Sequence, residues 1–165
     1  SIPTRRAVKR SLAISVPLSV LLVLVLTVFP LGEIIYQPSW GAMLVVFWCL
    51  YFAASLSLGS AFLLGLLLDG FSGTLLGSHA LSFCIVAYLT TLMNNRLVMF
   101  TWLQRALFVF VLIGISQIVL NWTLTLRGEA MSGFSYLYSA ATSAVIWPVW
   151  SVVMTLLYPG REIND

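Results

Sequence analysis

The chain has 165 residues, of which 61% are hydrophobic and only 8% are charged, against roughly a quarter in an average soluble domain. So few charges cannot cover a soluble domain, and so apolar a composition excludes intrinsic disorder. The net charge of +3 comes from arginines placed before and between apolar runs, which excludes a nucleic-acid-binding protein. We therefore expect a single membrane domain over residues 1–165.

The predicted membrane spans follow the stretches that carry no charged residue. About 20 apolar residues cross the hydrocarbon core, so the uncharged stretch 34–68, with 35 residues, is too long for one span. We divide this stretch near residues 55–57. Six transmembrane helices, two of them short, are then expected at about 12–29, 40–54, 57–69, 80–93, 103–126 and 134–158. The predicted fold class is all-α, a polytopic integral membrane protein.

The distribution of basic residues tests the number of spans. Basic residues concentrate on the cytoplasmic side of membrane proteins. Six spans with a cytoplasmic N-terminus place seven of the eight basic residues inside, whereas five spans place five inside and three outside. The sequence therefore predicts six spans with both termini in the cytoplasm.

Four tryptophans lie well inside the predicted spans, away from the ends where aromatic residues usually meet the membrane surface. We expect them to pack between helices; they are Trp48, Trp122, Trp147 and Trp150.

Asp69 is the only acidic residue within the apolar body of the chain. Ser57, Ala61, Gly65 and Asp69 recur every four residues and therefore share one face of the third predicted helix. Small residues at this spacing allow another helix to approach closely. The ridge ends at a glycine-rich turn over residues 70–77, which includes Gly73 and Gly77.

Three roles remain open for Asp69. It could anchor the helix end through hydrogen bonds to amides of the turn or to the hydroxyls of Ser72 and Thr74. It could instead contact a partner or a neighbouring subunit, or form an ion or proton site of a transporter. A transport site usually needs several inward polar groups. The sequence offers three other candidates: His79, Gln117 and Asn121.

No catalytic, cofactor or metal site is predicted. A single histidine, His79, with the distant Cys49 and Cys84 makes no metal site, and a hydrogen-bonded role suits His79 better. No nucleophile has a base nearby, and the glycines of residues 70–77 lack the lysine of a phosphate-binding loop. The cysteines lie in apolar runs and are expected to pack as small apolar side chains.

Two ridges of small residues are candidates for contact with a partner helix. One is Ser57, Ala61 and Gly65; the other pairs Ala140 with Ala144, beside Ser139 and Ser143. Short loops cannot supply about 800 Å² of interface alone, so we expect a partner to bind helix faces within the bilayer. The first ridge could instead pack within the protein itself.

Several short stretches follow one another in a distinctive order. They are Tyr36-Gln37-Pro38-Ser39-Trp40, Phe47-Trp48, Gly59, Gly65-Leu66-Leu67-Leu68-Asp69, Ser72-Gly73-Thr74-Leu75-Leu76-Gly77, Ala87-Tyr88-Leu89 and Trp147-Pro148. This order resembles the rod shape-determining protein MreD family of bacteria. The stretch from Asp69 to Gly77 is the most specific part of the resemblance.

The resemblance implies a non-enzymatic scaffold of the cell-elongation machinery in the bacterial inner membrane. Its implied partners are the bitopic protein MreC, filaments of MreB and, indirectly, RodA and the elongation transpeptidase that build lateral peptidoglycan. Membrane lipids surround it, no nucleic acid is involved, and self-association is left open. The family is also distantly similar to the six-helix substrate-binding subunits of energy-coupling-factor transporters. The alternative function is therefore a transporter subunit that binds a small vitamin-like molecule.

Overall fold

The computed structural model describes residues 5–29, 37–52, 58–97, 99–129, 133–134 and 136–158. Within these residues it contains six α-helices and no strand, which confirms the predicted all-α class. The helices are α1 (Arg5–Val28), α2 (Trp40–Tyr51), α3 (Leu58–Ser72), α4 (Ser78–Leu97), α5 (Trp102–Leu126) and α6 (Tyr136–Leu157).

Each helix overlaps one predicted span, but the ends differ. Helix α1 begins at Arg5 rather than near residue 12, because arginine and lysine are good helix formers and continue the helix beyond its apolar part. Helix α4 likewise extends to Leu97, past the last apolar run. The predicted division at residues 55–57 lies outside the described residues, between the end of α2 at Tyr51 and the start of α3 at Leu58.

Two helices, α5 and α6, are long and apolar enough to cross a membrane. Helices α2 and α3, together with the part Ala13–Val28 of α1, are shorter apolar helices. The number of membrane spans therefore stays a prediction.

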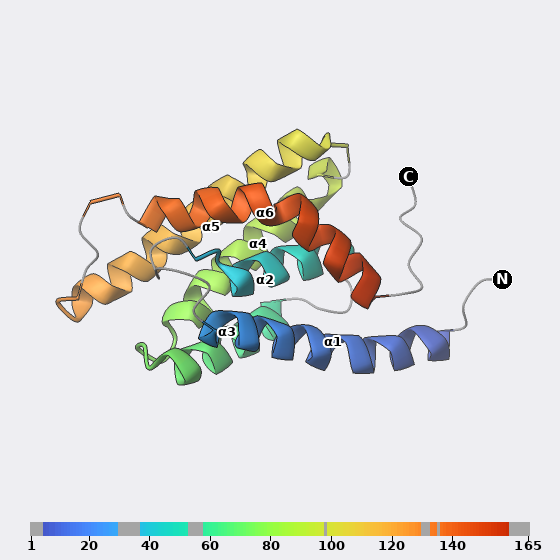
Figure 1. Ribbon diagram of the computed structural model, residues 1–165, viewed down its shortest axis with the longest axis horizontal. Coiled ribbons are helices and arrows are strands. Elements are labelled where there is room, and N and C mark those ends of the chain that lie inside the picture. The colour runs from blue at the N-terminus through green and yellow to red at the C-terminus, as the bar shows by residue number, and fades with distance from the viewer. Residues whose placement is uncertain are drawn as a thin grey trace.

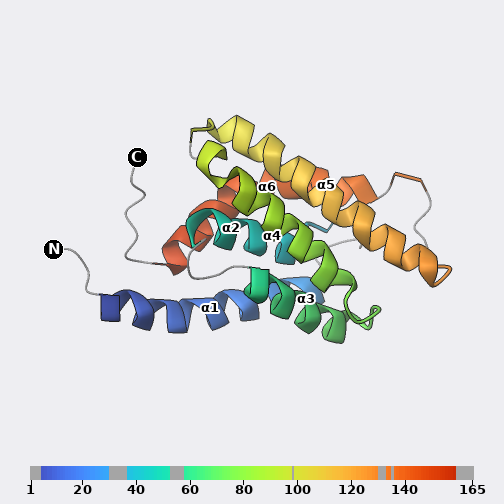
Figure 2. The same ribbon diagram turned by 180° about the vertical axis from the view of Figure 1, so that it is seen from behind.

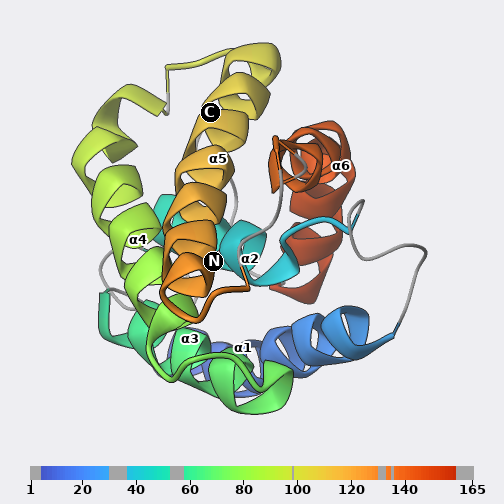
Figure 3. The ribbon, with the colours of Figure 1, turned by 90° about the vertical axis from the view of Figure 1, so that its left-hand side faces the viewer.

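Successive helices run in alternating directions, so α1 begins and α6 ends toward the same end of the molecule (Figure 1, and from behind in Figure 2). Helix α2 lies in the middle, with α4, α5 and α6 around it on one side and α1 and α3 on the other (Figure 3). Residues 41–49 of α2 are all buried, and residues 42–49 have at most 2% of their surface exposed. A helix buried on all sides needs apolar residues all round, and the sequence of α2 provides them.

The outer helices expose apolar side chains, including Leu21 on α1, Leu107 on α5 and Val145 on α6. Such side chains suit contact with lipid. Trp48, Trp147 and Trp150 are buried as predicted, but the prediction for Trp122 is wrong, because this side chain is 71% exposed. Trp122 lies in the last turns of α5, where a tryptophan can sit at a membrane surface.

Candidate functional site

The candidate site lies where α3 turns into α4. Asp69 is in the last turn of α3 and is only 1% exposed. The chain reverses through residues 73–77, and Gly73 and Gly77 hold positive φ angles of 64° and 103°. Side-chain-bearing residues rarely adopt such angles, so glycine at both ends lets the turn close tightly. The turn brings the start of α4 onto the carboxylate.

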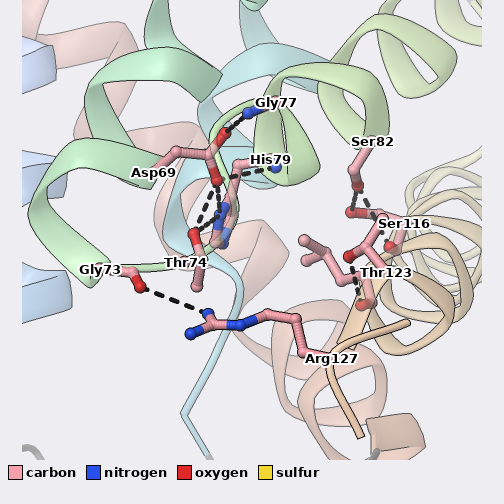
Figure 4. A network of polar contacts seen from close by, with 10 residues as sticks. Asp69, Gly73, Thr74, Gly77, His79, Ser82, Ser116, Thr123 and Arg127 are labelled. Carbon is pink, nitrogen blue, oxygen red and sulfur yellow. Dashed lines mark hydrogen bonds and ion pairs between the residues drawn. The ribbon is translucent and has the colours of Figure 1, made fainter. Parts of the chain in front are cut away.

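Asp69 accepts four hydrogen bonds from the turn and from α4 (Figure 4). The Thr74 hydroxyl donates to Oδ1 at 2.8 Å and the Gly77 backbone N–H donates to Oδ2 at 2.8 Å. His79 supplies two further bonds to Oδ1, from its backbone N–H at 3.0 Å and from Nδ1 at 2.7 Å. The carboxylate thus caps α4, whose first amides lack partners within the helix and favour a negative charge.

This geometry also fixes the orientation of the His79 ring. An ionised carboxylate has no proton to donate, so Nδ1 of His79 carries the hydrogen of the 2.7 Å bond to Asp69. The Thr74 oxygen lies 3.4 Å from the same nitrogen. The other ring nitrogen, Nε2, is left for a different partner.

These contacts match the anchoring role considered for Asp69, with the hydroxyl supplied by Thr74. The carboxylate is buried and saturated with donors, so it offers no exposed face to a partner or an ion. Gln117 lies on α5 and is not one of the donors to Asp69, and Asn121 lies on the same helix. The turn therefore brings together Asp69, Gly73, Gly77 and His79.

The ridge of α3 packs inside the protein, in line with the second of the two roles considered for it. Gly65 is buried, and a Cβ atom added there would lie 2.3 Å from the Cα atom of Ala80 on α4. Ala61 is 1% exposed. The third ridge residue, Ser57, lies outside the described residues. Periodicity shows which residues share a face but not whether the face meets another molecule or a neighbouring helix.

The ridge of α6 also makes contacts within the protein. Ala140 is fully buried and Ala144 is half-buried. The Ser139 hydroxyl donates to the backbone oxygen of Gln37 at 2.8 Å, and the Ser143 hydroxyl accepts from the backbone N–H of Ser39 at 2.9 Å. The ridge thus holds the segment that leads into α2.

A second polar cluster, absent from the sequence-based predictions, joins three helices. The buried hydroxyl of Tyr158, just after α6, lies 2.9 Å from the hydroxyl of Ser19 on α1. It also accepts a hydrogen bond of 2.9 Å from the indole N–H of Trp48 on α2. Tyr158 is more than 100 positions from both Ser19 and Trp48 in the sequence, so no local pattern reveals these contacts.

A smaller polar contact joins α4 and α5, where the hydroxyl of Ser82 lies against the hydroxyl and the backbone oxygen of Ser116 (Figure 4). Both serines are fully buried. No group of three or more potential metal ligands occurs among the described residues.

Comparison with known proteins gives consistent results. The family model described as rod shape-determining protein MreD matches residues 5–157. The rod shape-determining protein MreD of Haemophilus influenzae is 32% identical over 133 residues, covering 76% of this chain and 78% of that protein. No solved structure matches the chain. The match spans all six helices, including the Asp69 turn, and the chain therefore belongs to the MreD family of rod shape-determining proteins, which are membrane proteins and not enzymes.

Proposed function

We propose that this chain acts as a scaffold of the cell-elongation machinery in the bacterial inner membrane. The observation that carries the proposal is the family match over residues 5–157. The structure supports it in two ways. Its outer helices present apolar faces that suit lipid, and its most elaborate polar cluster holds two helices together rather than forming a reactive centre.

The proposed topology has six membrane spans and both termini in the cytoplasm. Helices of alternating direction return the chain to its starting side after an even number of spans (Figure 1). Seven of the eight basic residues then lie on the cytoplasmic side, as positive charge does in most membrane proteins. The Asp69 turn would face the outside.

The proposed direct partner is the bitopic protein MreC, and MreB filaments, RodA and the elongation transpeptidase would be reached through the assembly. Both small-residue ridges pack internally, so a partner helix has to meet the exposed apolar faces. On α6 such a face runs through Val145, Val149, Val152 and Leu156, each at least 60% exposed and spaced at one helical turn.

We further propose that Asp69 is a structural anchor for the α3–α4 turn. Four hydrogen bonds converge on a carboxylate that is 1% exposed, and two of them come from backbone amides at the start of α4. Bonds to a charged acceptor are stronger than neutral ones, so the turn gains a fixed shape.

The alternative, a transporter subunit that binds a vitamin-like molecule, would draw on the distant similarity to energy-coupling-factor subunits. Six alternating helices are compatible with that architecture. Membership of a shape-determining family favours the scaffold, and we keep ligand binding as a separate question, treated below.

The direct test is gentle purification of the protein from its native membrane, followed by identification of the proteins that remain bound. We expect a bitopic protein with a large periplasmic part. Leu18→Trp on α1, Leu107→Trp on α5 and Val149→Trp on α6 then locate its binding face, because each adds bulk to a different exposed surface. Recovery of no such protein, or full recovery with all three variants, would contradict binding through these helix faces.

A further inference from the structure

A cavity of about 230 Å³ lies beside the α3–α4 turn. All six helices contribute to its wall, through the second halves of α1, α3 and α5 and the first halves of α2, α4 and α6. Such a wall exists only once the bundle has packed. Ligand sites are often built in this way, between the helices of a bundle.

The wall of this cavity is mainly apolar with several uncharged polar groups, and it carries no Asp, Glu, Lys or Arg among the described residues that line it. Amide, hydroxyl and imidazole groups lie among aromatic and aliphatic side chains. The polar members used below are Gln37, His79, Gln117, Tyr136 and Ser139, and the aromatic walls include Trp40 and Phe83. A fully ionic ligand would lose its hydration there without gaining an opposite charge, which is costly.

His79 connects the cavity to the Asp69 cluster. Its Nδ1 donates to Asp69 at 2.7 Å, while the ring lines the cavity. The other ring nitrogen, Nε2, takes no part in this bond, and in the neutral imidazole it can accept a hydrogen bond. Asp69 does not line the cavity, so it acts as a positioning residue that fixes the ring for a ligand.

Gln117 faces the same cavity from α5. Its Nε2 is 3.4 Å from the Ser139 hydroxyl, a long contact, and that hydroxyl already donates to the backbone oxygen of Gln37 at 2.8 Å. The amide oxygen of Gln117 and the phenol of Tyr136 form no hydrogen bond with the described residues. Residues that carry an imidazole on α4, an amide on α5 and a phenol on α6 thus line one space.

We propose that this cavity binds a small neutral ring molecule that bears hydroxyl or amide groups and has one apolar face, about the size of a monosaccharide. The aromatic walls suit the apolar face, and the three groups above suit the polar edge. At about 230 Å³ the cavity is smaller than most drug-sized pockets. The ring could be a free solute or the uncharged headgroup of a lipid.

The test measures thermal unfolding of the full-length protein in detergent with three probes. They are N-acetylglucosamine, the same sugar carrying a short alkyl chain, and N-acetylglucosamine 6-phosphate. A ligand that binds only the folded state raises the unfolding temperature. We expect stabilisation by a neutral probe and none by the phosphate. A free-sugar effect indicates a solute, and an effect of the alkyl form alone indicates a headgroup. No stabilisation, or equal stabilisation by the phosphate, would overturn the proposal.

Variants of the wall then locate the binding. Gln117→Leu is expected to weaken the affinity for the stabilising probe about tenfold, and Tyr136→Phe by a few-fold, since each removes a hydrogen bond to the ligand. Ile118→Ala is the matched control, because its side chain is 52% exposed and lies next to Gln117. Tyr136→Phe removes a single oxygen atom, so it tests binding at the cavity wall even if Gln117→Leu fails to fold. Unchanged affinity in the wall variants would place binding elsewhere and overturn the proposal.

Discussion

Single side chains determine how the α3–α4 turn is held. Asp69 is the only acid in the apolar body of the sequence, and its two oxygens satisfy two backbone amides, a hydroxyl and an imidazole. Much of this site could be predicted from the sequence, because its partners lie only 5 to 10 residues further along the chain. The role of His79 was less predictable, since its ring orientation depends on how the turn closes.

Replacing Asp69 by leucine is expected to destabilise the protein strongly. It leaves the partly buried amides of Gly77 and His79 without an acceptor, at up to about 1–3 kcal/mol for each group. Asp69→Asn keeps one oxygen but turns its NH₂ group toward a hydrogen-bond donor. We therefore expect its stability to lie between those of the wild type and Asp69→Leu. Unfolding temperatures in detergent and protein levels in the membrane measure both. Equal stability of all three proteins would show that the carboxylate does not anchor the turn.

The hydroxyl of Tyr158 is the other single group on which several elements depend. Tyr158→Phe is expected to lower the free energy of unfolding by about 1–3 kcal/mol, because the indole N–H of Trp48 is buried and loses its acceptor. Tyr88→Phe is the control, since Tyr88 is 59% exposed, and should leave stability nearly unchanged. Similar unfolding temperatures for the two variants would argue against the Tyr158 cluster as a stabilising contact.

Helix packing sets the limits of what sequence patterns reveal. The helices could be predicted because uncharged apolar runs of suitable length have few other structures open to them in lipid. What each helix face contacts could not be predicted, because a ridge of small residues can pack equally well against a partner helix or against a neighbouring helix of the same chain. The small-residue pattern at Gly65 and Ala140 fits either environment, and both residues are buried within the bundle. The cavity escaped prediction because each helix contributes only a few residues to it.

The close approach of α3 and α4 at Gly65 gives a direct test of this packing. A Cβ atom there would lie 2.3 Å from the Cα atom of Ala80, so Gly65→Ala has to push the two helices apart. We expect a loss of about 1–3 kcal/mol and a lower membrane level. Gly70→Ala on the same helix, with nothing within 4 Å, should be neutral or slightly stabilising. Comparable behaviour of both variants would rule out tight packing at Gly65.

At the scale of the whole molecule, the six proposed spans place each loop on one of the two sides of the membrane. A cysteine introduced at Ser132 should be labelled by a membrane-impermeant reagent from outside intact cells, and one at Thr101 should not, because six spans place these positions on opposite sides. The background needs Cys49 and Cys84 replaced by alanine, as both thiols are free. Labelling of Thr101 but not of Ser132 would reverse the topology.

The central claim is that this six-helix protein sustains rod shape, and cell shape tests it most directly. The gene should be deleted in the bacterium that carries it and then resupplied as the wild type, as Gly70→Ala and as Asp69→Leu, with membrane levels measured in parallel. We expect deletion to produce rounded cells, the wild type and Gly70→Ala to restore rods, and Asp69→Leu to fail because the turn is no longer anchored. Deleted cells that keep their rod shape and width would contradict the account.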